Sequence, residues 1–187
     1  MKISFVIPAY NEEKLLPQCL ESVLREIEKN GAEAEVIVVN NASSDRTADV
    51  ARTFSGVKVV HEPRKGLTRA RQSGYEASSG DLIANIDADT LLTPQWIPLA
   101  LSEFSRDPHL VALSGPYVHY DLPLWQRAMV RFFYWVGYVM HLVNQHVLHA
   151  GAMLQGGNFV LRKSAVEKIG GLDTSIAFYG GVTDIAK

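Results

Sequence analysis

Short apolar runs alternate with longer amphipathic stretches through the first 115 residues of this 187-residue chain. The runs have the length and β-branched character of buried parallel strands; they span Ile3–Ile7, Glu35–Val39, Val57–His61, Asp81–Ile86 and Leu110–Ser114. The stretches between them predict helices over Lys14–Lys29, Asp45–Phe54, Leu67–Ala77 and Pro94–Phe104. Elements that alternate in this way predict an α/β fold with a doubly wound, mostly parallel sheet and helices on both faces.

The candidate chemistry lies in three loops of this predicted sheet. Parallel strands present their carboxyl ends at one edge, and ligands of such sheets bind there. The polar loops that follow the first, second and fourth strands are Pro8–Glu12, Asn40–Asp45 and Asp87–Thr90.

The most specific of these loops carries two carboxylates, Asp87 and Asp89, directly after an apolar strand. Alternate residues can converge where a strand ends, and two converging carboxylates repel unless a cation lies between them. Mg²⁺ and Mn²⁺ prefer such oxygen ligands and often also bind phosphate oxygens. The pair therefore indicates a metal that holds a diphosphate, although Asp is also common in solvated turns.

The other two loops offer groups that could bind a nucleoside. Tyr10 and Glu12 could stack on a base and bind ribose hydroxyls, and Asn11 could cap the following helix. The amides of Asn40 and Asn41 both donate and accept hydrogen bonds, so they could read a base edge. Ordinary turns would also account for both loops.

Three cations, Lys65, Arg69 and Arg71, lie at the start of a predicted helix. Cations gain nothing from the helix dipole at its N-terminus, so an anionic ligand is one explanation for them. Solvated basic side chains are the other.

The segment 121–154 differs in kind, because no Asp, Glu, Lys or Arg occurs between Arg131 and Arg162. We expect a long apolar helix here, either buried in the core or lying on a membrane surface. It is too interrupted for a membrane span, which needs about 20 apolar residues. His146 and His149 have helical spacing for zinc, but no third ligand is evident.

Composition narrows the class of protein further. The chain has the length of one domain, and its net charge of −2 argues against nucleic acid as a partner. Cys19 is the only cysteine, which excludes an internal disulfide and fits a reducing cytoplasm. The first strand begins right after Met1-Lys2, so we expect no signal peptide.

Taken in order, these motifs resemble glycosyltransferase family 2, the inverting nucleotide-sugar enzymes with the Rossmann-like GT-A fold. The resemblance covers essentially the whole chain. It rests on the motifs Val6–Glu13, Val38–Thr47, Gly66, Ala70-Arg71, Gly74, Gly80-Asp81, Ile86–Asp89, Gly156–Phe159 and Gly170–Asp173. It implies a donor-binding half over residues 1–115 and an acceptor-side half over 116–187, which ends before later acceptor-side elements of the family.

The resemblance also implies roles for individual residues. The donor-binding residues would be Pro8, Tyr10, Glu12, Asn40, Asn41, Arg71, Asp87 and Ala88. Asp87 and Asp89 would hold Mg²⁺ or Mn²⁺ on the diphosphate of a nucleotide-diphospho-sugar. A saccharide or lipid-linked acceptor would then attack the anomeric carbon with inversion. Independently of the resemblance, the single cysteine indicates a cytoplasmic protein, and the uncharged segment gives peripheral association with the inner face of the membrane as one alternative.

Two positions depart from the family pattern. Asn40 stands where the family usually has Asp, so a charge is lost and hydrogen bonding is kept. Gly181 and Val182 fall where the family places Glu-Asp, whose Asp is the expected general base. Asp184 is the candidate substitute base. The alternative is a non-catalytic nucleotide-sugar-binding or scaffold domain, or an inactive fragment.

Overall fold

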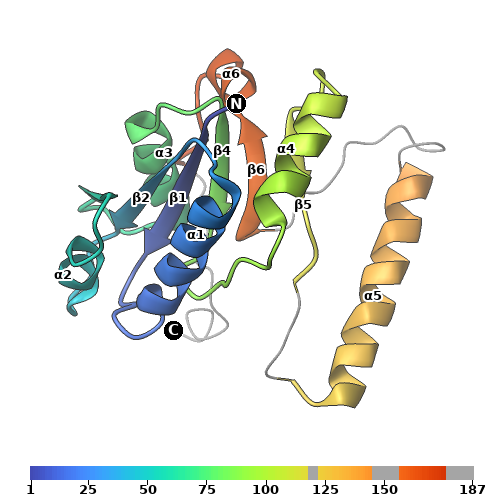
Figure 1. The fold of residues 1–187 in the computed structure, drawn as a ribbon, viewed down its shortest axis with the longest axis horizontal. Helices are drawn as coiled ribbons and strands as arrows, with labels where there is room; N and C mark the ends of the chain where they lie inside the picture. Colours follow the sequence, from blue (N-terminus) through green and yellow to red (C-terminus); the bar gives the residue numbers. More distant parts are fainter. Residues whose placement is uncertain (118–121, 145–155, 176–187) are drawn as a thin grey trace.

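The computed structural model describes residues 1–117, 122–144 and 156–175. Its strands are β1 Ile3–Ala9, β2 Ala34–Asn40, β3 Val57–His61, β4 Leu82–Ile86, β5 Ala112–Ser114 and β6 Asn158–Arg162. Its helices are α1 Leu16–Asn30, α2 Thr47–Arg52, α3 Leu67–Ala77, α4 Trp96–Arg106, α5 Leu124–Val143 and α6 Lys163–Lys168. The predicted α/β class is confirmed (Figure 1).

One six-stranded sheet organises the molecule, in the order β3-β2-β1-β4-β6-β5. Strands β1 to β4 are parallel, as their apolar sequences predicted. β6 runs antiparallel to both of its neighbours, β4 and β5. The alternation of strands and helices did not predict β6, because this strand follows the uncharged segment and not a helix–loop pattern.

Helices cover both faces of the sheet, and the alternation of side chains along β1 shows why. Phe5 and Ile7 point into a large core with residues of α1, α2 and α4. Val6 points to the opposite face, where it packs with Ala70 of α3 and Ile83 of β4. Each central strand is therefore apolar on both sides, as a buried parallel strand must be.

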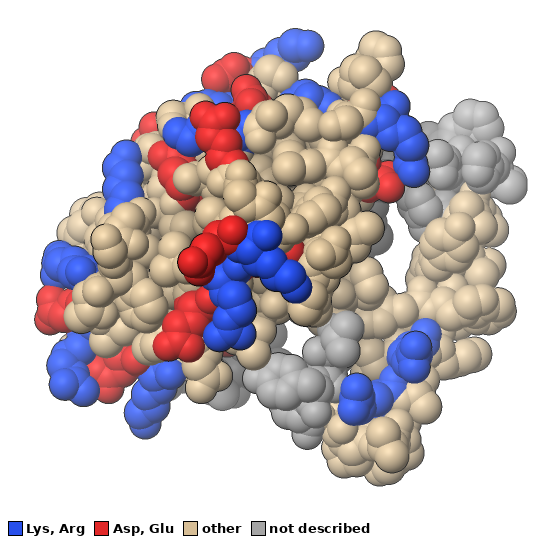
Figure 2. All heavy atoms as spheres, in the orientation of Figure 1, with Lys and Arg blue, Asp and Glu red and all other residues tan. Residues whose placement is uncertain are grey.

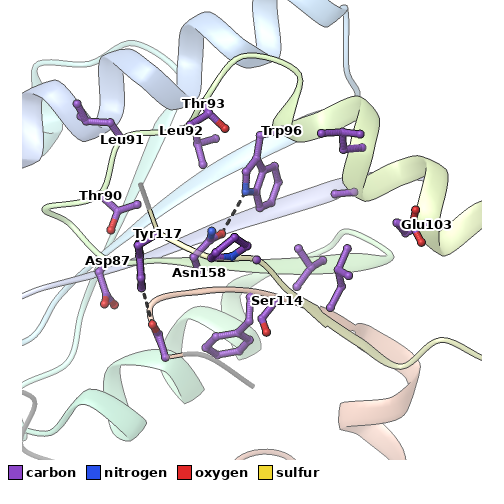
Figure 3. Close-up of a pocket in the computed structure, with 18 of the residues that line it drawn as sticks. Asp87, Thr90, Leu91, Leu92, Thr93, Trp96, Glu103, Ser114, Tyr117 and Asn158 are labelled. Carbon is purple, nitrogen blue, oxygen red and sulfur yellow. Dashed lines mark hydrogen bonds between the residues drawn. The ribbon is translucent and has the colours of Figure 1, made fainter. Parts of the chain in front are cut away.

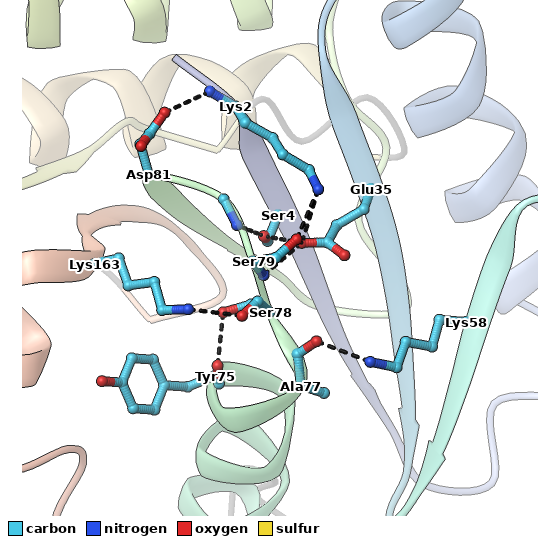
Figure 4. Close-up of polar contacts among 11 residues, drawn as sticks. Lys2, Ser4, Glu35, Lys58, Tyr75, Ala77, Ser78, Ser79, Asp81 and Lys163 are labelled. Atoms are coloured by element: carbon cyan, nitrogen blue, oxygen red, sulfur yellow. Dashed lines mark hydrogen bonds and ion pairs between the residues drawn. The ribbon is translucent and has the colours of Figure 1, made fainter.

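A polar network fastens the amino ends of the strands, at the opposite edge from the three candidate loops (Figure 4). The Glu35 carboxylate accepts hydrogen bonds from Ser4 Oγ at 2.6 Å and from the Ser79 backbone N–H at 2.6 Å. Burial alone would raise the pKa of Glu35, but these hydrogen bonds, with Lys2 nearby, lower it to about 2. The network thus holds the loop that leads into β4 against the amino ends of β1 and β2.

The helix α5 lies within the segment 121–154 that the sequence singled out, and to one side of the sheet (Figure 1). Its apolar side chains are largely exposed, so this helix is not buried in the core as one of our two expectations had it. No helix in the described ranges has the length and apolarity needed to span a membrane. The possible zinc pair, His146 and His149, lies outside the described residues.

The tightest contact between α3 and the sheet is at Gly74. A Cβ added there would lie 2.2 Å from Cγ1 of Val6 and 3.1 Å from Cγ2 of Val39. We expect Gly74→Ala to lower the free energy of unfolding by about 1–3 kcal/mol, because the helix must move off the sheet. Urea titration followed by circular dichroism measures this change.

The matched control is Gly137→Ala, which lies in α5 where an added Cβ meets nothing within 4 Å. It should be neutral or slightly stabilising, because Ala favours helix more than Gly does. Equal unfolding midpoints for the two variants would contradict the close packing of α3.

Candidate active site

A cavity of about 680 Å³ opens at the carboxyl ends of β1, β2 and β4. It lies among the loops that the sequence singled out. Its lining residues are Pro8, Ala9, Tyr10, Glu12, Asn41, Lys65, Gly66, Leu67, Ala70, Arg71, Asp87, Ala88, Asp89 and Gly156. The structure thus brings the predicted donor residues together around one cavity, apart from Asn40.

Asn40 lies deeper, at the end of β2. Its Nδ2 is 3.2 Å from Nδ1 of His61 on the neighbouring strand β3, and its Oδ1 is buried without a hydrogen-bond partner. The neighbouring Asn41 reaches the cavity but uses its amide on the backbone. It donates to the carbonyl of Arg64 at 2.8 Å and accepts from the N–H of Gly66 at 2.8 Å. Asn41 therefore shapes the loop that carries Lys65.

The loops after β1 and β2 are fastened to each other by side chains. Asn11, with a φ of 56°, accepts a hydrogen bond from the backbone N–H of Ser44 at 2.8 Å. The expectation that Asn11 caps α1 is therefore wrong, since that helix begins at Leu16. The backbone N–H of Glu12 donates to Oγ1 of Thr47 at 2.8 Å. These contacts hold Tyr10 and Glu12 at the mouth of the cavity.

Tyr10 and Lys65 face each other across this mouth. The Lys65 ammonium donates to the Tyr10 hydroxyl at 2.5 Å and lies 4.4 Å from the centre of its ring. The ring is still 44% exposed, so one of its surfaces is open to a ligand. Because Lys65 and Tyr10 come from different loops, their contact joins both sides of the cavity.

Asp87 is fixed by contacts on three sides. Its backbone N–H donates to the carbonyl of Gly157 at 3.0 Å, and its carbonyl lies 3.6 Å from Sγ of Cys19. Its carboxylate accepts a hydrogen bond from Nη2 of Arg71 at 3.3 Å. The Arg71 guanidinium in turn lies over the ring of Phe159, 5.1 Å from the ring centre, and its Nε is buried without a partner. Asp89 is exposed at the next turn.

Gly157 and Tyr117 complete the site, and our reading of the individual residues missed both. Gly157 has a φ of 86°, and a Cβ on it would lie 1.9 Å from Oδ2 of Asp87 and 2.2 Å from the Tyr117 hydroxyl. The Tyr117 hydroxyl donates to the carbonyl of Gly156 at 2.6 Å. Paired glycines before a strand were the available signal, because they allow another side chain to approach the backbone closely.

Burial and like charges shape the electrostatics of the site. Burial raises the pKa of Asp87, and Asp89 raises it further, while Arg71 acts in the opposite direction. Burial, then Asp89, also raises the pKa of Glu12. Burial next to Asp87 raises the pKa of Tyr117 to about 12, so its phenol stays neutral. The negative charge of the site is thus only partly compensated by Arg71.

A second cavity, of about 1030 Å³, is also lined by the two aspartates; Figure 3 shows most of its lining residues. It shares Asp87, Asp89 and Gly156 with the first cavity. Its walls come from α4, β5, β6 and the loop after β4. Trp96 connects α4 to β6, because its Nε1 donates a hydrogen bond to Oδ1 of Asn158 at 3.1 Å. The two cavities therefore meet at the carboxylate pair.

Comparison with known proteins identifies the family. The model of glycosyl transferase family 2 matches residues 4–170. The chain belongs to this family. Among its relatives, the probable glycosyltransferase YdaM of Bacillus subtilis is 30% identical over 92% of this chain and 43% of its own length. A dolichol-phosphate mannosyltransferase of Pyrococcus furiosus is 34% identical over 63% of this chain and 34% of its own length.

A solved structure shares the fold of this chain. The mannosyltransferase PcManGT of Pyrobaculum calidifontis, in complex with GDP-Man and Mn²⁺, superposes with a TM-score of 0.72 at 20% identity. The superposition covers 93% of this chain and 48% of that one, and it shows the fold that the two share. The chain spans less than half the length of each of these three proteins.

Asp184, the candidate substitute base, and the Gly181-Val182 pair lie outside the described residues. The described part of this family 2 chain contains no cluster of three or more His, Cys, Asp or Glu that could ligate a metal. Asp87 and Asp89 form a pair of carboxylates and not a cluster of that kind.

The raised pKa of Asp87 predicts how this site affects stability. The folded protein binds a proton at Asp87 more tightly than the unfolded chain does, so stability falls as pH rises through the raised pKa. Replacing Asp89, whose charge adds to this effect, should relieve part of the cost. We expect Asp89→Asn to raise the Tm at pH 7 without divalent cations.

The gain in Tm should shrink as the pH falls below the ordinary pKa of Asp, because Asp87, whose pKa is raised, is then protonated and no longer repels a charge at residue 89. Asp49→Asn is the matched control, since Asp49 is exposed on α2 and pairs with Arg52 at 2.7 Å. A Tm gain for Asp89→Asn that does not change between pH 7 and acid would exclude charge repulsion as its cause.

Proposed function

We propose that this domain transfers a glycosyl group from a nucleotide-diphospho-sugar to an acceptor, with inversion and with the help of a divalent metal. The observation that carries the proposal is the carboxylate pair at the junction of two cavities. A glycosyl transferase needs a donor and an acceptor to meet at one point, and this junction supplies such a point. We propose residues 1–115 as the donor half and 116–187 as the acceptor-side half.

The smaller cavity suits the donor. The open surface of the Tyr10 ring can stack on a base, and the carboxylate of Glu12 can accept hydrogen bonds from ribose hydroxyls. Arg71 lies in the same wall, so its guanidinium can donate to a diphosphate oxygen. Asn41 and Ala88 form part of the cavity wall. Asn40 does not line the cavity; we propose that it supports the wall indirectly, through its contact with His61 between β2 and β3.

The donor set of the carboxylate pair fits Mg²⁺ or Mn²⁺. Asp87 and Asp89 offer hard oxygen ligands. Burial, and then the charge of Asp89, raise the pKa of Asp87, and a bound cation would favour its ionised form. A metal bound there would neutralise charge on the nucleoside-diphosphate leaving group. The chain's own contribution is to orient Asp87 through Gly157 and Arg71 and to keep the Tyr117 hydroxyl protonated beside it.

The larger cavity suits the acceptor. It includes Asp87 and Asp89 in its lining but not Tyr10, so an acceptor hydroxyl bound there would lie next to the carboxylate pair. Its walls include Trp96, Leu92 and Leu113, which favour a partly apolar acceptor. We propose a saccharide or a lipid-linked acceptor; the relative from Pyrococcus furiosus is named for dolichol phosphate. The free, buried Cys19 is compatible with the cytoplasm as the site of reaction.

Metal-dependent binding of a nucleoside diphosphate tests the donor site. Calorimetry with UDP and GDP should give tight binding with Mn²⁺ and a loss of about tenfold or more in affinity with EDTA, since the diphosphate then meets uncompensated carboxylates. Asp89→Ala should abolish the metal dependence, whereas the exposed control Asp49→Ala should retain it. Equal affinity with and without EDTA would contradict the proposal.

Sequence alone supports a further proposal about the chemical step. We propose that transfer by this chain is slow, with Asp184 as its remaining base, because Gly181 and Val182 replace the usual acidic pair. Gly181→Glu with Val182→Asp should raise the transfer rate by up to about 10² to 10⁴. The amide control, Gly181→Gln with Val182→Asn, should not raise it.

Turnover of a radiolabelled nucleotide sugar on lipid-phosphate and saccharide acceptors measures these rates. Donor binding without transfer by any of these chains would favour the alternative, a nucleotide-sugar-binding domain. If the unmodified chain transfers sugar quickly and Asp184→Asn does not slow this transfer, another group is the base.

A further inference from the structure

The helix α5 exposes an unusual number of large apolar side chains. Three of its aromatic side chains are largely exposed: Trp125 at 66%, Phe133 at 63% and Trp135 at 61%. Phe132 stacks on Trp135 with ring centres 6.1 Å apart, so the apolar surface is continuous along the helix. Figure 2 shows this helix as a largely uncharged body beside the mixed charges of the sheet domain. Soluble proteins rarely expose such a contiguous surface without a partner.

The charges of α5 restrict what that partner can be. The described residues 122–144 contain two charged side chains, Arg127 and Arg131, and no acidic one. The arginines are four residues apart, and Trp135 follows after four more, so all three share one face of the helix. They lie in its first half, where cations gain nothing from the helix dipole. An arrangement of arginines and aromatic rings on one face is complementary to a negatively charged, amphipathic surface.

We propose that α5 docks on an anionic lipid surface, with its aromatic side chains at the level of the headgroups and its arginines on lipid phosphates. Tryptophan and tyrosine prefer this interface because they combine an apolar body with a polar group. Helices with such a composition lie in the plane of the membrane surface. The same helix from a second copy would supply apolar area but no carboxylate opposite Arg127 and Arg131.

The contacts of α5 connect this docking surface to the larger cavity. The Tyr134 hydroxyl, on α5, accepts a hydrogen bond from the backbone N–H of Tyr117 at 3.0 Å. Tyr117 lines the larger cavity next to Asp87. A membrane bound by α5 would therefore lie near the proposed acceptor side. Docking itself does not depend on the proposed function; the supply of a lipid-linked acceptor by this route does.

Vesicle flotation tests the proposal with the full chain. The vesicles contain phosphatidylcholine alone, or phosphatidylcholine mixed with phosphatidylglycerol. The chain should float with the anionic vesicles and much less with the neutral ones. Arg127→Gln with Arg131→Gln should weaken binding to anionic vesicles roughly fivefold for each arginine lost. Arg25→Gln with Arg52→Gln, at exposed positions on α1 and α2, is the matched charge control and should weaken it less.

The aromatic test pairs Phe132→Ser/Trp135→Ser with a control that removes exposed apolar side chains elsewhere, Val111→Ser/Ile169→Ser. The α5 variant should lose about tenfold or more in binding to both vesicle types, because the apolar contact is lost, and the control should not. Because α5 side chains are exposed, both variants should unfold at the same urea concentration as the parent chain.

Three results would overturn the proposal: flotation with neither vesicle, flotation that Phe132→Ser/Trp135→Ser leaves unchanged, or a dimer in solution that this variant dissociates while vesicles do not bind. Mn²⁺-dependent UDP and GDP binding, measured on the same variants, separates the two proposals. If the parent chain binds nucleotide but does not float, only the docking proposal is contradicted. If it floats but shows no Mn²⁺-dependent nucleotide binding, only the proposed donor site is contradicted.

Discussion

The carboxylate of Asp87 is the group on which the arrangement of the site depends. A half-buried negative charge is stable only where hydrogen bonds, a cation or both compensate for lost water. Nη2 of Arg71 donates to the Asp87 carboxylate at 3.3 Å, and the Asp87 backbone N–H donates to the Gly157 carbonyl at 3.0 Å. The pKa of Asp87 is nevertheless raised. The sheet thus holds a charge that Arg71 compensates only in part, which is the condition under which a divalent cation binds well.

This constraint also accounts for how the two parts of the chain are joined. β4 ends at Ile86 and delivers Asp87, while β6 returns antiparallel beside it. The turn before β6 must come close to the carboxylate, and the absence of a side chain at Gly157 makes this possible. The loop after β4 therefore lines both cavities, through Asp87 and Asp89. A sugar transfer reaction needs such a shared boundary between its two substrates.

Much of this arrangement was predictable from the sequence, because it depends on local patterns. Apolar runs gave the five strands β1 to β5 within a few residues, and polar residues after β1, β2 and β4 gave part of the lining of the smaller cavity. What could not be predicted depends on contacts between distant segments. Periodicity does not reveal that β6 runs backwards, that Asn41 bonds the 64–66 loop, or that Tyr117 reaches Asp87. The sequence also did not predict that the side chains of α5 are exposed, since their composition fits both a buried core and a membrane interface.

The central claim is that Asp87 and Asp89 hold a divalent metal where the two cavities meet. Paramagnetic broadening of backbone amide NMR signals by Mn²⁺, in the presence of a nucleoside diphosphate, tests it most directly. We predict that signals of residues 87–90 and 156–158 broaden first, while those of α6 and of the network around Glu35 stay sharp. Broadening centred elsewhere, or equal broadening in Asp87→Asn/Asp89→Asn, would contradict the account.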